Sequence, residues 1–226
     1  NKELPNNSCL LSFDDGFKDH AKFVLPELNK RKLKGVFFPP GAAIIENEIL
    51  DVHSIHFILN KIKNESTLVS ILNSLCLENG CNEKDLKNYW NIYGKKGRYD
   101  SKEVIYFKRM LQFVLPLNLR KKITNFLFKK YLNISTSEFA KELYMNKDDL
   151  NKLLESEMCI GSHGYNHYWL NTLNYQNQKK DIEKSLNFLK EIGAPTKNWI
   201  MCYPYGAYNS DTLDLLYNKN CVFGFL

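Results

Sequence analysis

One short segment restricts the fold of this chain more than any other. The apolar run Leu11–Phe13 ends in two adjacent carboxylates, Asp14 and Asp15, and then Gly16. Neighbouring residues of an extended strand point to opposite faces, so two adjacent carboxylates can share a pocket only where the strand turns. Gly16 permits such a turn. We therefore predict the end of a strand at an active site, with two carboxylates in one pocket and a cation that balances their charge.

A second segment supplies partners for that cation. His163 and His167 stand four residues apart, after another strand-like apolar run. One carboxylate with two imidazoles can hold a divalent metal and leave coordination positions open for water and substrate, as in hydrolytic sites. Taken alone, each segment also fits a simple turn or an ordinary pair of surface or core histidines. A third apolar run, which starts at Met201, ends in the turn Pro204–Gly206.

In this order the three segments resemble the motifs of the polysaccharide deacetylase family, carbohydrate esterase family 4. Ser12–Gly16 is similar to the first motif, Ser162–His167 to the metal-binding second motif and Cys202–Gly206 to the third. Val36–Phe38 is similar to the second strand of the family's barrel. The resemblance covers roughly 8–45 and 145–226, and it implies a distorted (β/α) barrel.

The resemblance also implies a role for each polar residue of these motifs. Asp15, His163 and His167 would hold a divalent metal, most often zinc. Asp14, free of the metal, would be the general base. The backbone N–H of Tyr205 would stabilise the charge that develops on the acyl oxygen.

The sequence departs from the family pattern at three points. Gly164 stands where the second motif often has Ser or Thr, and Cys202 stands where the third motif often has an Arg. The late Leu-x-His motif, which supplies the general acid in the family, would lie beyond Leu226. We therefore expect the chain to continue past that residue, as part of a longer protein.

The pattern along the chain alternates between strand-like and helix-like segments. It predicts strands at 8–13, 35–39, 158–162, 198–203 and 220–226, helices at 18–33, 174–192 and 210–219, and a long helical stretch at 46–157. Such alternation favours parallel strands, with the motifs at their carboxyl ends. The predicted fold class is α/β, a barrel of the polysaccharide deacetylase type in a single catalytic domain over 1–226, with a helical insertion at 46–143.

The insertion is strongly basic. Between Lys84 and Lys130 there are thirteen Lys and Arg against three Asp and Glu, whereas the whole chain carries only +6. This charge favours an anionic carbohydrate substrate, such as a nucleotide-linked or lipid-linked sugar or an acidic polysaccharide. The amphipathic segment 117–132 could instead rest on an anionic membrane surface, or be a helix with one core face and one solvated face. No recognised motif accompanies the charge, so nucleic acid is not an expected partner. Oligomeric state stays open.

The six cysteines show no Cys-x-x-Cys spacing. Cysteines in strand-like apolar runs behave as small buried hydrophobes, which favours a reducing compartment, although Cys76 and Cys81 could pair. The sequence shows no secretory leader and no apolar run of membrane-spanning length, so we predict a cytoplasmic location. The remaining histidines are His20, His53 and His56. His53 and His56 are interpreted as structural or surface residues, although one of them could instead reach the substrate from the insertion.

These observations lead to one functional hypothesis with two alternatives. The leading hypothesis is a metal-dependent hydrolase that removes acetyl groups from N-acetylated sugars, in a glycan or in a precursor of a cell-surface glycan. The first alternative is a sugar O-deacetylase, because the same chemistry attacks either acyl carbon. The second is a degenerate, non-catalytic glycan-binding domain. A metalloprotease is disfavoured, because no Glu lies between the two histidines.

Overall fold

The structure is a computed structural model that describes residues 6–226 and divides into two compact units. Unit 1 combines 6–48 with Ala140–Leu226, and unit 2 is Ile49–Phe139. The two stretches of unit 1 carry all three motifs, and unit 2 contains most of the predicted insertion 46–143.

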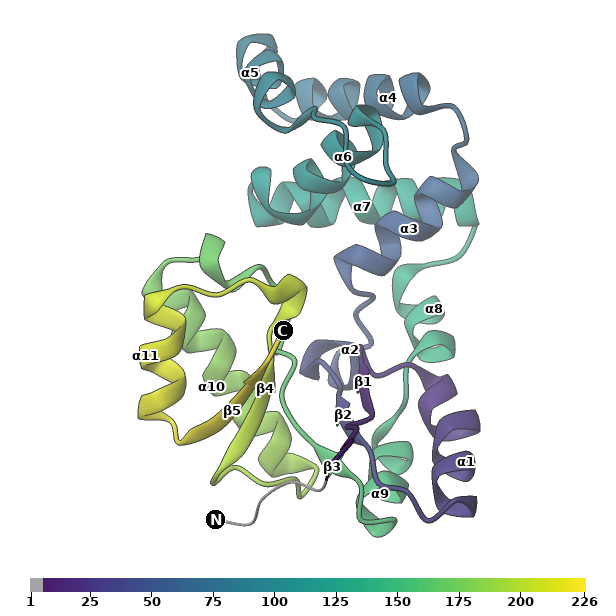
Figure 1. The fold of residues 1–226 in the computed structure, drawn as a ribbon. Helices are drawn as coiled ribbons and strands as arrows, with labels where there is room; N and C mark the ends of the chain where they lie inside the picture. The colour runs from purple at the N-terminus through teal and green to yellow at the C-terminus, as the bar shows by residue number, and fades with distance from the viewer. Residues whose placement is uncertain (1–5) are drawn as a thin grey trace. The chain divides into compact units, whose positions relative to one another are not determined.

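Unit 1 is built on parallel strands. In the described part of the chain these are β1 (Ser12–Asp14), β2 (Val36–Phe38), β3 (Cys159–Ile160), β4 (Trp199–Cys202) and β5 (Cys221–Phe225). β2 pairs with β1 and with β3, and β4 pairs with β5 (Figure 1). A parallel bridge between Ser162 and Met201 joins the two sets. The strands therefore follow one another in chain order, as in a parallel (β/α) arrangement.

The strands curl toward one another instead of forming a flat layer. Phe38 of β2 and Phe225 of β5 touch, with their ring centroids 5.4 Å apart, although β3 and β4 lie between these strands in the order. Together with Val36, Ile200 and Cys202 these rings form a compact apolar cluster. Such curvature is what a distorted barrel requires, so the interior of unit 1 agrees with the predicted fold class.

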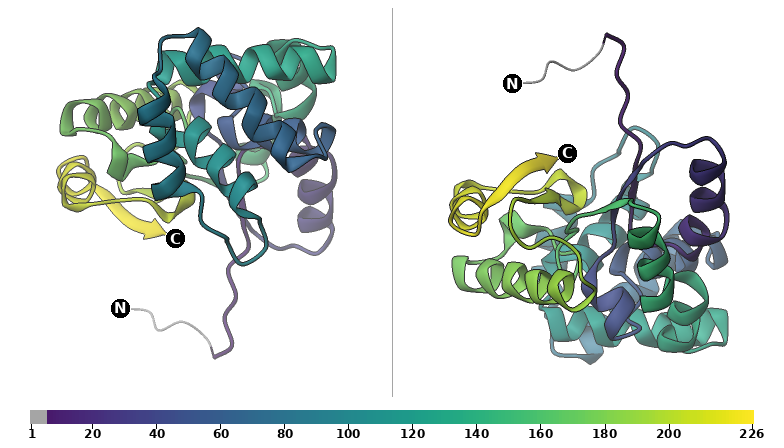
Figure 2. Two further views of the ribbon diagram at one scale, coloured as in Figure 1. Left: turned by 90° about the horizontal axis from the view of Figure 1, so that it is seen from above. Right: turned by 90° about the horizontal axis from the view of Figure 1, so that it is seen from below.

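Helices surround the strands of unit 1. They are a π-helical turn (His20–Val24), α1 (Leu25–Lys30), α2 (Gly41–Ile45), α9 (Lys147–Glu155), α10 (Tyr175–Glu191) and α11 (Ser210–Asn218), with 3₁₀ turns at Leu170–Thr172 and Pro204–Gly206. The last three helices begin after Asn146, Asn174 and Asn209, whose side chains each accept a backbone N–H from the first turn. Asparagine is among the preferred residues at this position. α10 and α11 pack on each other beside β4 and β5 (Figure 2).

Unit 2 is helical in its described residues. It contains α3 (Asp51–Lys61), α4 (Glu65–Glu78), α5 (Glu83–Tyr93), α6 (Lys102–Arg109), a π-helical turn (Met110–Val114), α7 (Leu117–Leu132) and the start of α8 (Thr136–Leu143). α3 packs along α7, and α4 packs on α6. Phe57, Phe128 and Phe139 form an aromatic cluster with centroid separations of 4.8–6.4 Å. Unit 2 therefore has a hydrophobic core of its own.

The amphipathic helix α7 directs its apolar side into this core. Ile123 and Leu127 are buried, and α7 packs against α3. Arg120, one of the basic residues of α7, is only 6% exposed, and its guanidinium lies 4.0 Å from the carboxylate of Asp51. α7 thus has one core face and one solvated face. No helix among the described residues has the length and apolarity needed to cross a membrane.

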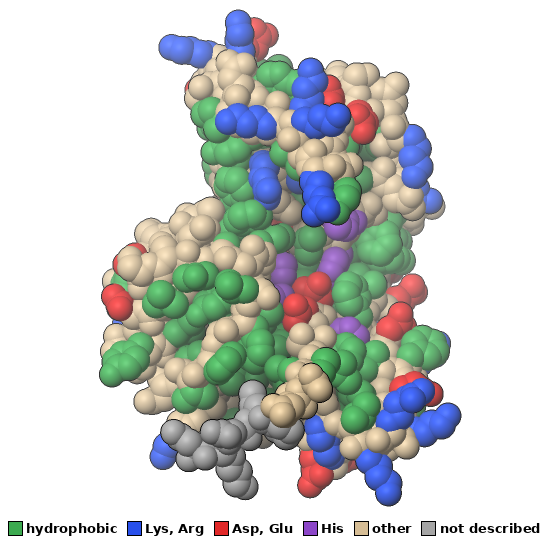
Figure 3. Space-filling model, in the orientation of Figure 1, with side chains coloured by type: hydrophobic (Ala, Val, Ile, Leu, Met, Phe, Trp, Pro, Cys, Tyr) green, Lys and Arg blue, Asp and Glu red, His purple; other side chains and the backbone are tan. Residues whose placement is uncertain are grey.

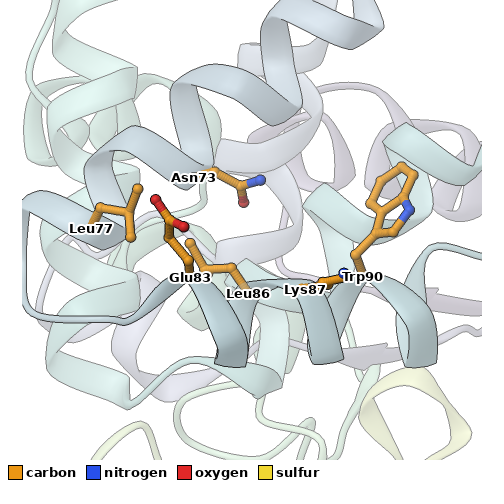
Figure 4. Close-up of a pocket in the computed structure, with 6 residues that line it drawn as sticks. All are labelled: Asn73, Leu77, Glu83, Leu86, Lys87 and Trp90. Atoms are coloured by element: carbon orange, nitrogen blue, oxygen red, sulfur yellow. The ribbon is translucent and has the colours of Figure 1, made fainter.

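A shallow pocket of about 290 Å³ lies between α4 and α5 of unit 2 (Figure 4). Asn73 and Leu77 line it from α4, and Glu83, Lys87 and Trp90 are among the residues that line it from α5. The walls are mainly apolar, and the two charged residues have opposite signs. The pocket therefore offers no concentration of metal ligands or of basic charge.

The predicted elements differ from the observed ones mainly in their limits. Every predicted strand is present but shorter; the first, for example, covers Ser12–Asp14 instead of 8–13. The predicted helix 18–33 is a π-helical turn followed by α1, where Pro26 lacks the N–H that a continuous helix needs. The predicted helical stretch 46–157 consists of separate helices, and α2 was not predicted.

Candidate metal and active site

The paired carboxylates lie at the carboxyl end of β1, where the chain turns. Asp15 has a φ of 69° and Gly16 also has a φ of 69°, so both adopt the left-handed conformation. For Asp15 this conformation costs about 1–2 kcal/mol. A Cβ on Gly16 would lie 3.0 Å from the Cβ of Pro39, so glycine is needed for space as well as for conformation. The turn predicted from Gly16 is confirmed, and Asp15 shares in it.

The loop that follows β3 brings two histidines to this turn. His163 and His167 are 4% and 7% exposed, and their ring centroids are 4.7 Å apart. Asp15 Oδ1 lies 3.5 Å from His163 Nε2 and 3.3 Å from His167 Nε2. Ligand atoms about 2.0–2.1 Å from a tetrahedral ion are separated by about 3.3 Å. The three residues therefore fit a divalent metal, and Figure 3 shows histidine and acidic side chains gathered on one face.

A backbone contact orients the first histidine. His163 Nδ1 lies 2.8 Å from the carbonyl oxygen of Cys202, at the end of β4. A carbonyl can only accept, so Nδ1 carries the proton and donates it. The lone pair is then on Nε2, which faces Asp15. A hydrogen bond of this kind on the distal ring nitrogen is typical of histidines that bind metals.

A buried carboxylate holds the loop between the two histidines. Asp181 of α10 is 2% exposed. Its Oδ2 accepts the backbone N–H of Tyr165 at 2.9 Å, and its Oδ1 accepts the backbone N–H and the side-chain amide of Asn166 at 3.1 and 2.6 Å. Burial raises the pKa of Asp181, while the hydrogen bonds from Asn166 and Tyr165 oppose that rise. Asp181 thus ties α10 to the loop that carries His163 and His167.

Gly164 leaves the space that Asp181 occupies. Its φ is 69°, and a Cβ at this position would lie 3.1 Å from Asp181 Oδ2. A Ser or Thr here would therefore crowd the carboxylate. The departure from the family motif at Gly164 and the buried position of Asp181 are two parts of one local arrangement.

Sequence reasoning missed Asp181, although a signal was present. Asp181 shares the buried face of α10 with Ser185, Phe188 and Leu189, at helical spacings of four, seven and eight residues. A carboxylate on the buried face of an amphipathic helix needs partners, because desolvation of an unpaired charge is costly. That periodicity indicated a buried Asp, but not which loop supplies its donors.

The third motif lies beside the metal-ligand set. Tyr205, between Pro204 and Gly206, has a φ of 59° and a ψ of 11°. The ring centroid of Tyr205 is 4.7 Å from that of His167. The Tyr205 ring also stacks on the Trp169 ring, with 4.7 Å between the two centroids. Asp15, His167 and Tyr205 are all non-glycine residues in the left-handed region. Such strained backbone is typical of functional sites. Trp169 was not among the predicted site residues.

Cys202 places a thiol against the second carboxylate. Its Sγ lies 3.6 Å from Asp14 Oδ2. Burial, together with the neighbouring Asp14, raises the pKa of the Cys202 thiol to about 12. The thiol therefore stays protonated at neutral pH and donates to Asp14. Where the family motif often has a cation, this chain has a neutral donor.

The remaining histidines do not join this set. His20 lies in unit 1 against Phe13, Phe17 and Phe37, with ring centroids 5.6–5.9 Å away. Burial lowers the pKa of His20. His53 and His56 belong to α3 of unit 2, one buried and one exposed. Among the described residues, neither belongs to a group of three metal-binding side chains.

Comparison with known proteins agrees with this fold. The sequence model of the polysaccharide deacetylase family matches residues 117–222, a stretch that includes His163, His167 and Tyr205. Two solved structures are similar to this chain: the deacetylase PplD of Streptococcus pyogenes, in complex with acetate, and the BpsB deacetylase domain of Bordetella bronchiseptica. Each is 14% identical to this chain, with TM-scores of 0.50 and 0.51. No curated protein sequence matches the chain.

These structures are longer than the chain. The matches cover 96% and 98% of this chain but only 55% of PplD and 64% of the BpsB domain. At 14% identity the likeness concerns the fold. With the parallel strands, the ordered motifs and the family match, it defines an α/β protein with a deacetylase fold. The chain thus matches the polysaccharide deacetylase family model over residues 117–222 and has the fold of two solved deacetylases.

Proposed function

We propose that this chain is a metal-dependent de-N-acetylase that acts on N-acetylated sugars, with zinc as its metal. One observation carries the proposal: Asp15, His163 and His167 form a compact ligand set, with Asp14 and Tyr205 next to it. A structural metal site would need neither a second carboxylate nor an open side. The match of residues 117–222 to the polysaccharide deacetylase family model supports an acetylated carbohydrate as the substrate class.

Each residue of the site is proposed to have a separate role in the hydrolysis. Asp15, His163 and His167 would hold a divalent ion, which would supply Lewis-acid chemistry by lowering the pKa of water and polarising an acyl carbonyl. Asp14 is outside that set and exposed, so it can accept the proton of the attacking water. The backbone N–H of Tyr205 would donate to the acyl oxygen as charge develops on it. The products are acetate and a free amine.

The substrate is proposed to be anionic or to be linked to an anionic carrier. Unit 2 exposes a set of basic side chains: Lys84, Lys87, Lys95, Lys96, Arg98, Lys102, Lys122, Lys129 and Lys130. Such a field attracts a nucleotide-linked or lipid-linked sugar, or an acidic polysaccharide, at low ionic strength. A precursor of a cell-surface glycan, linked to a nucleotide or lipid carrier in the cytoplasm, would offer both the acetylated sugar and the negative charge.

The non-catalytic alternative is supported by a single feature. Cys202 stands where the family often has an Arg, so Asp14 has a neutral neighbour instead of a cation. A glycan-binding domain would tolerate this change more easily than an enzyme. The complete metal-ligand set and the retained Asp14 favour the catalytic proposal.

The test measures metal content and acetate release in parallel. A panel of N-acetylated glycans and nucleotide sugars, with O-acetylated counterparts, is offered to the wild-type chain, to Asp14→Asn and to the exposed control Asp19→Asn. We expect Asp14→Asn to retain the metal and lose acetate release by about 10²–10⁴-fold, the usual contribution of a general base. Asp19→Asn should behave as the wild type. Bound metal without acetate from any substrate would favour the glycan-binding alternative, and release only from O-acetylated sugars would favour the esterase.

A further inference from the structure

The site contains a second set of potential metal ligands, and this set includes a thiol. Asp14, His163 and Cys202 offer ligand atoms that all lie within 4.8 Å of one another. Asp14 Oδ2 and Cys202 Sγ are 3.6 Å apart. On a tetrahedral ion with bonds of about 2.0 Å to oxygen and 2.3 Å to sulfur, these two atoms would be about 3.5 Å apart. Oxygen and sulfur therefore already have nearly the spacing of two ligands on one ion.

The two sets share one ligand. His163 donates from Nδ1 to the Cys202 carbonyl, so only its Nε2 lone pair is available to an ion. His163 can therefore serve either Asp15 and His167 or Asp14 and Cys202, but not both at once. The first set offers oxygen and nitrogen alone, whereas the second adds sulfur.

The donor atoms decide which ion each set prefers. Thiolate is a soft ligand and selects soft metals, while carboxylate and imidazole are harder. Cys202 and His163 are 5% and 4% exposed, and Asp14 is exposed, so an ion can reach the set from solvent on the side of Asp14. We propose that Asp14, His163 and Cys202 form a second ion site, selective for soft divalent ions such as cadmium, that competes with the Asp15–His163–His167 set for His163.

Occupation of the second site has a chemical consequence. A bond forms between the ion and Cys202 Sγ, and the thiol proton is released to solvent. Asp14 becomes a ligand and can no longer accept a proton from water. A soft ion would therefore inhibit the hydrolysis. This inhibition rests on the proposed function, whereas binding of the ion does not.

The experiment titrates the metal-free chain with cadmium chloride. Binding is monitored through the ultraviolet charge-transfer absorption between thiolate and cadmium. Three variants separate the sets: Cys202→Ser removes the sulfur, His167→Ala removes a ligand of the first set only, and Cys9→Ser removes an exposed thiol outside both sets. Zinc affinity is measured on the same proteins. Circular dichroism verifies the fold, and Cys202→Ala serves as a second sulfur-free variant.

We expect the absorption band, saturated by a single ion, in the wild type, in Cys9→Ser and in His167→Ala. In Cys202→Ser the cadmium affinity should fall roughly tenfold or more, since loss of even an outer partner of a metal ligand costs 10–100-fold. Zinc affinity should show the opposite pattern, reduced in His167→Ala and retained in Cys202→Ser.

Two results would overturn the inference. A band of unchanged strength in Cys202→Ser and Cys202→Ala would assign the signal to another thiol. Cadmium binding to the wild type without the band, weakened in His167→Ala and unchanged in Cys202→Ser, would place cadmium in the first set. Failure of the proposed function has a different signature, since zinc would bind through His167 and no acetate would be released.

Discussion

The carboxylate of Asp181 accepts the backbone N–H of Tyr165 at 2.9 Å, and in this way α10 is connected to the loop that carries His163 and His167. Tyr165 in turn donates from its hydroxyl to Glu46 at 2.8 Å and accepts the backbone N–H of Ala42 of α2. Helices from distant parts of the sequence thus hold one short loop. Since metal affinity depends on how well the ligands are oriented before the ion arrives, this bracing bears on function.

Replacement of Asp181 should weaken metal binding as well as the fold. In Asp181→Asn an amide replaces one acceptor oxygen, so at least one donor of Tyr165 or Asn166 is left without its partner. We expect a loss of at least about 2 kcal/mol in the free energy of unfolding and a decrease of about 10–100-fold in zinc affinity. Chemical denaturation and a zinc competition titration measure the two effects. The exposed residue Asp214, changed to Asn, is the control, and equal zinc affinities in the two variants would contradict the role of Asp181.

Gly164→Ala tests the space beside Asp181. Its cost has two parts, the left-handed φ of 69° and the contact of 3.1 Å between the new Cβ and Asp181 Oδ2. Gly193→Ala carries only the first part, because its φ is 76° and nothing lies within 4 Å of its Cβ. We expect Gly193→Ala to lose about 1–2 kcal/mol of unfolding free energy and Gly164→Ala to lose more, together with zinc affinity. If both variants lost the same stability and kept zinc affinity, the contact with Asp181 would be unimportant.

Two neighbouring phenylalanines of α7 should differ sharply in their importance. Phe128 is fully buried in the aromatic cluster of unit 2, whereas Phe126 is 49% exposed. Phe128→Ala should therefore lower the unfolding free energy by about 3–5 kcal/mol. Phe126→Ala should change it by no more than about 0.5 kcal/mol. Thermal or urea denaturation provides the comparison. A larger loss from Phe126→Ala would mean that the face of α7 assigned to solvent carries packing that the structure does not show.

The stability of the metal-free chain should depend on pH through His20. Burial holds the pKa of His20 below its ordinary value of 6.5, and its Nδ1 has no hydrogen-bond partner among the described residues. As the pH falls through 6.5 the unfolded chain takes up the proton before the folded chain does, so protonation favours unfolding. Denaturation on either side of pH 6.5 should show an acid-dependent loss of stability that is smaller in His20→Gln. The same pH dependence in both proteins would show that His20 titrates normally.

The order of strands and helices was largely predictable, because apolar runs and their punctuation are local properties of the sequence. Strand limits were less predictable. The apolar run before Asp14 suggested a strand over 8–13, yet the pairing with β2 begins only at Ser12. A strand extends only as far as its hydrogen-bonded partner does. The π-helical turn before α1 was also not predictable. Pro26 indicates that a regular α-helix is interrupted nearby, but it does not determine which conformation the preceding residues adopt.

The residues of the candidate site were predictable from the sequence, but the residues that hold them in place were not. Asp14, Asp15, His163, His167 and Tyr205 were named from motifs, and the structure brings them together. Their roles remain proposals. Asp181 and Trp169 were missed, because their partners are separated from them by long stretches of chain or by turns whose geometry only the folded backbone determines.

The sequence by itself determined which side chains are available for chemistry: paired carboxylates, two imidazoles at a fixed spacing, a turn after a strand and a cysteine in place of a cation. Only the tertiary structure decided how these groups meet. It placed Asp15 Oδ1 at 3.3–3.5 Å from both imidazoles, left Asp14 beside the thiol of Cys202, and buried Asp181 under the loop. The physical reason is that residue type sets the chemistry of a donor or acceptor, whereas distances between atoms remote in the chain result from packing and from the backbone conformations that packing stabilises.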